Sequence, residues 1–404
     1  MNEEYLLNLD FSQANLTEEE IRIAEEKVKK LEVPFFAKYS PDFAAIRKMG
    51  KTYTDKKNII IEGNGGSIST VRAFSSCFSP DTGKNVFILD TDDPDYIATI
   101  KKKCPVEDTL LIVINRSGNS IQTISGYLLL QEYDTLFITT SGSTLCQIGE
   151  ARKVPTCITS AEEQPVSRFS GISEFHLVPA AIMGMDIETI TKGAQEMYAK
   201  CAPQSPLSSN LALQFALHLD KLEKIGYTEI FLSIYSKKLS GFFELITQLF
   251  HESVCKNGKG QTIFGSDAPE NQHHTLQRFN SGRKNCVGFF ITVENFKNDF
   301  QIEVPEEIKT IMCRNIDIAT FGKLKAADVI HTEFEGTWKD ATEEKLPAIN
   351  LQMKEVSPSS VGSLVAFFQY AAYYSSLLRD VNPFDQPGVE KSKEYIFQLV
   401  AEKK

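Results

Sequence analysis

Two apolar segments that each run directly into a loop rich in glycine and serine restrict the fold of this chain more than any other feature. The first is Asn58 to Glu62, followed by Gly63 to Ser67, and the second is Thr109 to Ile114, followed by Asn115 to Ser120. A helix is predicted after each loop. Nearly continuous apolar strands that alternate with helices indicate a parallel sheet with both faces covered.

The same alternation continues through the rest of the chain. In the first half, Val86 to Asp90, Thr135 to Thr140 and Val154 to Ile158 are further predicted strands. A stretch with the composition of a linker, 201–210, precedes a predicted helix at Leu211 to Lys224. The strands predicted for the second half are Thr228 to Ile234, Val287 to Val293, Ala327 to His331 and Ala348 to Met353.

The fold class predicted from this pattern is α/β, with two αβα sandwiches built on doubly wound, mostly parallel sheets. We expect one domain at residues 1–200, a second at 206–380 and a C-terminal helical arm at 381–404. Ligands of such sheets bind beyond the C-terminal ends of the strands.

The two glycine loops have the composition of an anion site. Backbone N–H groups at a tight turn and helix N-terminus attract negative charge even in an acidic protein. Neither loop has Walker spacing, and Ile68 stands where a dinucleotide fingerprint requires its third glycine. The hydroxyl groups suit a single phosphate, although loops between strands and helices are often rich in glycine and serine for structural reasons alone. These hydroxyl groups belong to Ser67, Ser69, Ser117, Ser120 and Thr123.

Glu252 is the strongest candidate for a catalytic base. Apolar residues recur every three or four positions from Leu239 to Phe250, so an amphipathic helix is predicted to deliver Glu252 near its C-terminal end. Gly258 and Gly260 are predicted to stop that helix. A solvated carboxylate is the ordinary explanation of such a residue, whereas partial burial close to lysine would leave it competent as a base near neutral pH.

The histidines near Glu252 in the sequence leave two further interpretations open. A carboxylate and an imidazole separated by a glycine-rich turn suit proton transfers at two positions of a small substrate. His251, Cys255, His273 and His274 could alternatively be drawn as a zinc site, although the usual ligand spacing is absent. Adjacent side chains such as those of His273 and His274 usually point apart.

Charge, the N-terminal sequence and cysteine usage argue against a nucleic-acid-binding, secreted, membrane-spanning or disulfide-bonded protein. The net charge of −10 argues against a nucleic-acid partner, because such binding needs clustered lysine and arginine. The N-terminus has neither the basic start nor the apolar stretch of a signal peptide, and no apolar run reaches membrane-spanning length. The eight cysteines include no C-x-x-C pair, which is typical of reduced thiols. A cytoplasmic protein without a membrane partner is therefore expected.

Taken together, six segments of the chain resemble the phosphoglucose isomerase family, whose members have two sugar-isomerase (SIS) domains of αβα type. For example, Gly63 to Ser67 is similar to the family's G-I-G-G-S, and Glu252 to Lys256 is similar to its E-S-x-G-K. The remaining segments are Asn115 to Thr123, Arg168 to Ala181, Gln272 with His273, and Asp385 to Lys393.

The resemblance implies interconversion of glucose 6-phosphate and fructose 6-phosphate, a reaction of glycolysis and gluconeogenesis, with neither a metal nor another cofactor. It implies that His273 and Lys393 help to open the sugar ring. Glu252 would then move a proton between C2 and C1 through an enediolate, which Arg168 would stabilise. A structural ion pair with a carboxylate is the ordinary explanation for a lone arginine like Arg168.

The resemblance also implies a phosphate site and a homodimer in which the partner subunit supplies the histidine. The residues expected to surround the substrate and its phosphate are Gly66, Ser67, Asn115, Arg116, Ser117, Ser120 and Thr123. The chain departs from the family pattern at Asn115, Asn119, Gln122, Val166, Ser167 and Cys255. The Asn115 amide is expected still to donate a hydrogen bond to phosphate. The altered glycines near Arg168 leave open an isomerase that also accepts mannose 6-phosphate. A non-catalytic sugar-phosphate sensor is a second alternative, because such domains also serve as ligand-binding modules.

Overall fold

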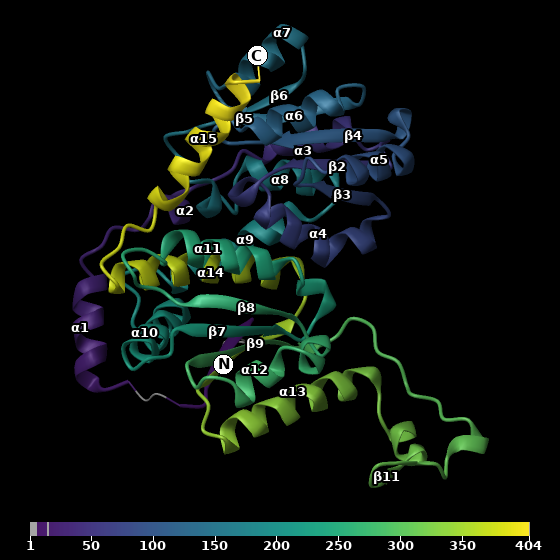
Figure 1. The fold of residues 1–404 in the computed structure, drawn as a ribbon, viewed down its shortest axis with the longest axis vertical. Coiled ribbons are helices and arrows are strands. Elements are labelled where there is room, and N and C mark those ends of the chain that lie inside the picture. The colour runs from purple at the N-terminus through teal and green to yellow at the C-terminus, as the bar shows by residue number, and fades with distance from the viewer. Residues whose placement is uncertain (1–5, 14–15, 404) are drawn as a thin grey trace.

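The computed structural model describes residues 6–13 and 16–403, and its elements are arranged on two five-stranded sheets (Figure 1). The first sheet is parallel throughout, in the order β3-β2-β4-β5-β6. Each of its strands lies within two residues of the predicted bounds. They are β2 (Asn58–Gly63), β3 (Asn85–Leu89), β4 (Thr109–Ile114), β5 (Asp134–Thr140) and β6 (Thr156–Thr159).

Both faces of this first sheet are buried, which explains why its strands are nearly continuous apolar runs. In β4, Ile112 faces the core formed with α4 and α8, while Leu111 faces the core formed with α5, α6 and α7. Both side chains are fully buried. The helices are α4 (Ser69–Thr82), α5 (Pro94–Lys103), α6 (Ile121–Leu129), α7 (Thr144–Arg152) and α8 (Glu174–Ile182), with α3 (Phe43–Thr52) packed on α8.

The second sheet has the order β1-β12-β9-β7-β8 and is parallel except at β1, which pairs antiparallel with β12. Its strands are β1 (Leu7–Phe11), β7 (Glu229–Ile234), β8 (Thr262–Asp267), β9 (Cys286–Asn295) and β12 (Ala348–Glu355). The α/β prediction with mostly parallel sheets is therefore confirmed. The edge strands β1 and β8 were not predicted.

Two local predictions in the second half are wrong. The segment Ala327 to His331 is not a strand but the first part of α13 (Ala326–Glu343). A short apolar run does not distinguish a strand from a helix, and here Asp328 accepts a hydrogen bond from the Lys325 N–H at 2.8 Å, which caps a helix.

The other wrong prediction concerns the end of α11 (Phe242–Ser253), which stops before Gly258 and Gly260. Asn257, Gly258 and Gly260 have φ angles of +55°, +73° and +95°. This left-handed backbone shapes the loop between α11 and β8 rather than the helix end itself.

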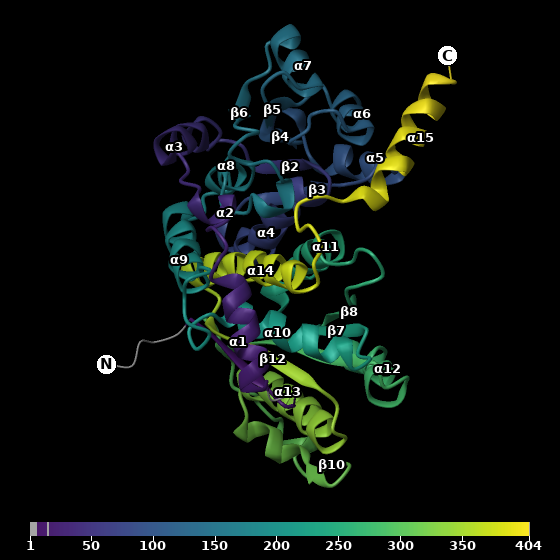
Figure 2. The ribbon, with the colours of Figure 1, turned by 90° about the vertical axis from the view of Figure 1, so that its left-hand side faces the viewer.

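A layer of helices separates the two sheets (Figures 1 and 2). At its centre is α14 (Pro358–Leu378), which is buried over most of its length. It packs on α9 (Ile187–Lys200), α10 (Leu211–Lys224) and α11. The helix α11 belongs to the second half of the chain, and one of its sides faces the first half. Its last turn therefore lies between the two halves.

Two parts of the chain project from this core (Figures 1 and 2). The C-terminal helix α15 (Glu390–Ala401) stands apart beside the first half, and the small hairpin of β10 (Met312–Cys313) and β11 (Ile316–Asp317) projects at the opposite end. Among the described residues, none of the helices is both long enough and apolar enough for a membrane crossing. The remaining α-helices are α1 (Glu18–Val28), α2 (Phe35–Lys38) and α12 (Leu276–Ser281).

Candidate active site

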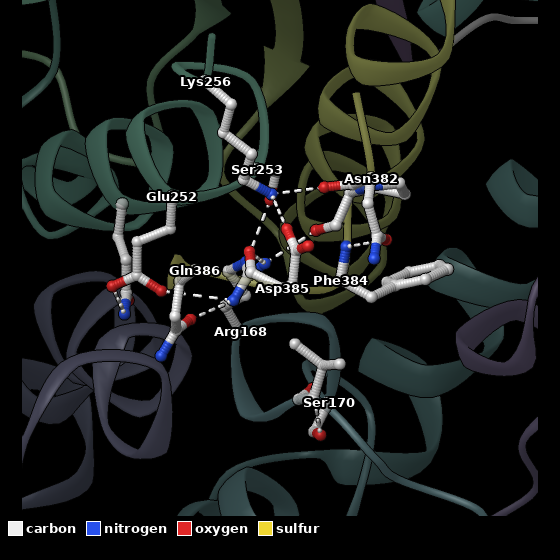
Figure 3. Close-up of polar contacts among 12 residues, drawn as sticks. Arg168, Ser170, Glu252, Ser253, Lys256, Asn382, Phe384, Asp385 and Gln386 are labelled. Atoms are coloured by element: carbon white, nitrogen blue, oxygen red, sulfur yellow. Dashed lines mark hydrogen bonds and ion pairs between the residues drawn. The ribbon is translucent and has the colours of Figure 1, made fainter. Parts of the chain in front are cut away.

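Arg168 is the centre of the polar cluster between the two halves. It lies in the short helix η3 (Ser167–Phe169) and is 2% exposed. Its Nε donates to Ser253 Oγ at 2.9 Å, and its Nη1 donates to Glu252 Oε2 at 3.3 Å (Figure 3). A buried guanidinium in this position joins the first half of the chain to the end of α11.

The same guanidinium also holds a segment from the C-terminal part of the chain. Its Nη1 donates to Gln386 Oε1 at 2.5 Å, and its Nη2 donates to the carbonyl oxygens of Pro383 at 2.7 Å and Asp385 at 3.0 Å. Burial lowers the pKa of Arg168, while the charges of Glu252 and Asp385 act in the opposite direction. An arginine nevertheless stays charged in proteins, so the cluster holds a buried cation with planar, directed donors.

Glu252 is fixed through both of its carboxylate oxygens. Gln248, one helical turn earlier on α11, donates from Nε2 to Oε1 at 3.0 Å, while Arg168 occupies Oε2. The side chain remains 30% exposed. The carboxylate therefore has a fixed orientation and an open side from which a small molecule can reach it.

The glycine loop of the first sheet closes against this cluster. In η1 (Gly65–Ser67), a Cβ atom on Gly66 would lie 2.4 Å from the backbone nitrogen of Arg168, so glycine is required for this close approach. Gly65 has a φ of +52°, and a Cβ there would lie 2.7 Å from Gln248 Nε2. The loop, Arg168 and the last turns of α11 thus form one packed site, with Ser67 buried beside them.

The second glycine and serine loop is organised by Asn115. Its Nδ2 donates to Thr123 Oγ1 at 2.8 Å, and its Oδ1 accepts from Ser117 Oγ at 3.0 Å and from the Gly118 N–H at 2.7 Å. The side chain that we expect to donate to phosphate also holds the loop together through these three hydrogen bonds. Asn115 and Thr123 are buried, whereas Ser117 is exposed.

Arg116 and Ser120 complete that loop. Burial lowers the pKa of Arg116. Its backbone carbonyl accepts a hydrogen bond from Thr140 Oγ1 at 2.8 Å, which ties the loop to the end of β5. Arg116 and Ser120 are both half-buried, so these two residues and exposed Ser117 remain the ones that a bound anion can reach.

A cavity of about 280 Å³ lies beside Glu252. Its walls include Asn64, Ser69, Arg72 and Gln248. Within the described residues, Asn64 Nδ2 and Ser69 Oγ are buried without a hydrogen-bond partner. The ion pairs of Arg72 run to Asp90 Oδ2 and to Glu244 Oε2, each at 2.6 Å.

The zinc interpretation receives no support in residues 6–13 and 16–403, where His, Cys, Asp and Glu form no group of three or more that could hold a metal. His251 has a structural contact: its Nε2 accepts from the Ile263 N–H at 2.9 Å. Burial lowers the pKa of His251, which keeps its ring neutral.

His273 and Lys393 are not brought to the cluster within one chain. His273 ends η5 (Glu270–His273) and is exposed, and Lys393 Nζ donates to Glu390 Oε1 at 2.8 Å on α15. In the described part of the chain, the hydrogen bonds and ion pairs of Arg168 and Glu252 involve neither residue.

Two glutamines in the cluster were not among the predicted site residues. Gln386 belongs to the C-terminal motif noted in the sequence, and Gln248 lies four residues before Glu252, the spacing at which side chains meet on a helix. Both signals were therefore visible in the sequence. The hydrogen bond from Gln248 to Glu252 forms within α11, whereas the hydrogen bond from Arg168 to Gln386 forms only when separate segments of the chain pack together.

Two solved structures share this fold over most of the chain. A glucose-6-phosphate isomerase from Chlamydia trachomatis superposes with a TM-score of 0.74, at 17% identity, covering 98% of this chain and 89% of that one. A hypothetical protein from Thermus thermophilus has a TM-score of 0.84 at 22% identity, with 94% of each chain covered. The shared fold places the protein in the structural class of two-sheet α/β proteins that these two structures define.

Sequence comparison narrows this class to one family. The family model described as phosphoglucose isomerase matches residues 165–404. The chain is 27% identical over 360 residues to the glucose-6-phosphate isomerase of Methanocaldococcus jannaschii, with 87% of this chain and 86% of the relative covered. It is also 27% identical over 385 residues to the enzyme of that name from Enterococcus faecalis, with 89% and 84% covered. The chain belongs to the phosphoglucose isomerase family, as its sequence motifs predicted.

Proposed function

We propose that this protein is an aldose–ketose isomerase that interconverts glucose 6-phosphate and fructose 6-phosphate through an enediolate. The observation that carries the proposal is the Glu252–Arg168 pair, joined at 3.3 Å in a site where Arg168 is almost fully buried. Membership of the family supports the substrate and the reaction.

Glu252 is the proposed base, because a sugar C–H group is a very weak acid. A carboxylate removes such a proton only if the charge that develops on the substrate oxygen is stabilised at once. Arg168 supplies this stabilisation with its buried positive charge and with the Nη1 donor that it gives to Glu252, while Ser253 and Gln386 hold the guanidinium in place. The protonated Glu252 then returns the proton to the neighbouring carbon, so the reaction needs no external oxidant or reductant.

The substrate phosphate is assigned to the two glycine loops at the C-terminal ends of β2 and β4. Backbone N–H groups at such loops favour an anion. The proposed contacts come from the Gly66–Ser67 loop and from Ser117, Ser120 and Arg116, while buried Thr123 supports the loop through its hydrogen bond with Asn115. For Asn115 we propose an indirect role, since its amide is bonded to Thr123.

His273 and Lys393 are proposed to open the sugar ring, and this part of the proposal needs a homodimer in which the partner subunit supplies its histidine. The exposed position of His273 supports a contribution to another chain. The side chains of Tyr395, Phe397 and Leu399 on α15 are 50%, 52% and 58% exposed, which also supports a covering partner. We further propose the domain division 1–200, 206–380 and 381–404 and a cytoplasmic location.

The test of the base is the substitution Glu252→Gln, which keeps the shape of the side chain and removes its proton affinity. Conversion of fructose 6-phosphate to glucose 6-phosphate is expected to fall about 10²- to 10⁴-fold in kcat. The matched control is Glu343→Gln, which changes a glutamate with a 69% exposed side chain on α13 and should leave turnover unchanged. Undiminished turnover by Glu252→Gln would reject the assigned base.

A second measurement tests the enediolate. In deuterated water, transfer through a carboxylate lets the abstracted proton exchange with solvent, so deuterium should appear at C2 of glucose 6-phosphate in the proton NMR spectrum. A direct hydride shift between the carbons would give product without solvent deuterium.

A further inference from the structure

The segment Asn382–Gln386, called here the C-terminal strap, is fixed in place before α15 begins. Its Asn382 Oδ1 accepts from the Phe384 N–H at 3.0 Å. The Phe384 ring packs against Phe169 and Tyr373 with ring centroids 5.3 and 5.8 Å apart. The strap is therefore an ordered part of the site, although it belongs to no helix or strand (Figure 3).

Three acceptors for the Arg168 guanidinium come from this strap. They are the carbonyl oxygens of Pro383 and Asp385 and the side-chain oxygen of Gln386. Arg168 Nη1 is shared between Gln386 and Glu252. A shift of the strap would therefore turn the guanidinium away from the carboxylate, because the same donor serves both partners.

Lys256 attaches the strap to the loop that follows α11. Its Nζ lies 2.7 Å from Asp385 Oδ1 and also donates to the Asn382 carbonyl oxygen, so it contacts both ends of the strap (Figure 3). The Lys256 side chain is only 10% exposed. The hydrogen bond from Lys256 lowers the pKa of Asp385, which keeps this carboxylate charged.

The position of Lys256 in the chain gives this contact its importance. Lys256 lies four residues after Glu252, beyond the end of α11, and its polar contacts in the described residues do not include Glu252 or Arg168. It therefore links the segment that carries the carboxylate to the segment that orients the arginine, without belonging to the reacting pair.

We infer that Lys256 is a positioning residue, which holds the C-terminal strap through Asp385 and Asn382 so that Gln386 and Arg168 stay aligned with Glu252. This inference rests on the proposed function for its effect on turnover. Its structural part, the attachment of the strap, can be measured without substrate.

The catalytic test compares Lys256→Met, which keeps the length of the stem and removes the ammonium, with Lys256→Arg, which restores a cation. A small displacement of catalytic groups can cost about 10²-fold, so kcat of Lys256→Met should fall by about that factor, with a smaller change in KM. Lys256→Arg should recover much of this loss. If Lys256→Met folds and keeps wild-type kcat, or if Lys256→Arg is no better than Lys256→Met, the inference is overturned.

The matched control is Lys27→Met. Lys27 Nζ pairs with Asp380 Oδ1 at 2.6 Å, two residues before the strap, but both side chains are exposed. The turnover of Lys27→Met should stay within about twofold of wild type, because exposed ion pairs contribute little to holding a segment in place. A loss in Lys27→Met equal to that in Lys256→Met would overturn the specific role of Lys256.

A double-mutant cycle tests whether Lys256 acts through Asp385. If the two residues act as one unit, Lys256→Met combined with Asp385→Asn should lose no more activity than Lys256→Met alone. Independent, multiplying losses would contradict the proposed route.

Hydrogen exchange separates this inference from the proposed function. Without substrate, peptides that span 379–390 should exchange at least about tenfold faster in Lys256→Met than in wild type or Lys27→Met, because the strap is released. Unchanged exchange would reject the attachment of the strap. A wild-type protein that does not isomerise sugar phosphates would reject the proposed function, and the exchange result would still decide whether Lys256 holds the strap.

Discussion

Arg168 combines roles that a lysine could not fill. Of the five hydrogen bonds from its planar guanidinium, two go to Glu252 and Ser253 on α11 and three go to the strap. A lysine ammonium has three donors on a flexible stem and cannot match this geometry. Because the arginine is buried, each of these acceptors also offsets the cost of removing its charge from water.

The buried carboxyl group of Glu62 gives a prediction about pH. Glu62 is the next-to-last residue of β2, close to the glycine loop. It is 1% exposed, and its Oε2 has no partner among the described residues. Burial, and secondly the charge of Asp92, raise its pKa well above the ordinary value of 4.5. A carboxyl group with a raised folded-state pKa favours folding below its unfolded pKa and loses that contribution as the pH rises.

Glu62→Gln should therefore become more stable than wild type as the pH increases from about 4.5 toward 8, because the variant cannot ionise. Urea unfolding at pH 5 and pH 8 measures the difference in the free energy of unfolding. The exposed Glu335→Gln serves as the control and should show no such trend. A constant difference between Glu62→Gln and wild type at both pH values would contradict the buried, neutral carboxyl group.

At the residue scale, the sequence identified Glu252 and Arg168 because each stands in a short motif with neighbouring signals. It could not identify the contact between Arg168 and Gln386, which are 218 positions apart. Such a contact depends on how three separate segments pack, and no local periodicity encodes it. The role of Asn115 was likewise hidden, since an amide can face a ligand or its own loop.

At the element scale, the crossing of α9 and α14 depends on close backbone contact. A Cβ on Gly362 of α14 would lie 1.9 Å from the carbonyl oxygen of Ile190 on α9, and a Cβ on Gly193 would lie 2.0 Å from that of Ser359. Ser363 Oγ also donates to the Gly193 carbonyl oxygen at 2.9 Å. Each of the two helices therefore contributes a glycine to their close contact.

Gly362→Ala should destabilise the protein by about 1–3 kcal/mol, because the added methyl group forces the helices apart. Gly336→Ala is the matched control. Gly336 also lies in a helix, α13, but a Cβ there meets open space, so this change should stabilise by about 0.5–1 kcal/mol. Unfolding of both variants in guanidinium chloride measures the changes in the free energy of unfolding. An equal change for the two substitutions would contradict the close contact between α9 and α14.

The sequence predicted all five strands of the first sheet, and the two strands that it missed in the second sheet, β1 and β8, are the edge strands of that sheet. All six residues of β4 are buried, which leaves a continuous apolar signal. In β1 and β8 only one or two residues are fully buried, so polar residues interrupt the pattern. Edge strands are recognised from their pairing partners, which a single local window does not contain.

At the scale of the whole molecule, the two halves bring Arg168 and Glu252 together, while His273 remains on the surface of the same chain. If His273 acts in the site of the partner subunit, mixed dimers of Glu252→Gln and His273→Ala chains should regain activity. One of their two sites would then contain an intact Glu252 and an intact partner histidine, giving about half of wild-type activity in purified mixed dimers.

Coexpression with two affinity tags and assay of the purified mixed dimers provides the measurement. The control pairs Glu252→Gln with the double variant Glu252→Gln/His273→Ala, in which no complete site can form. Mixed dimers no more active than this control would place His273 in its own subunit's site, or outside catalysis.

The pairing of β1 with β12 carries a consequence for biosynthesis. Leu7 faces Met353 and Phe11 faces Ile349 across the antiparallel ladder, so β1 is paired by the strand that follows all other strands of both sheets in the chain. During translation β1 stays without this partner until β12 has been synthesised and has left the ribosome. A ribosome stalled before residue 348 therefore carries a nascent chain in which the second sheet lacks β12 and β1 is still unpaired.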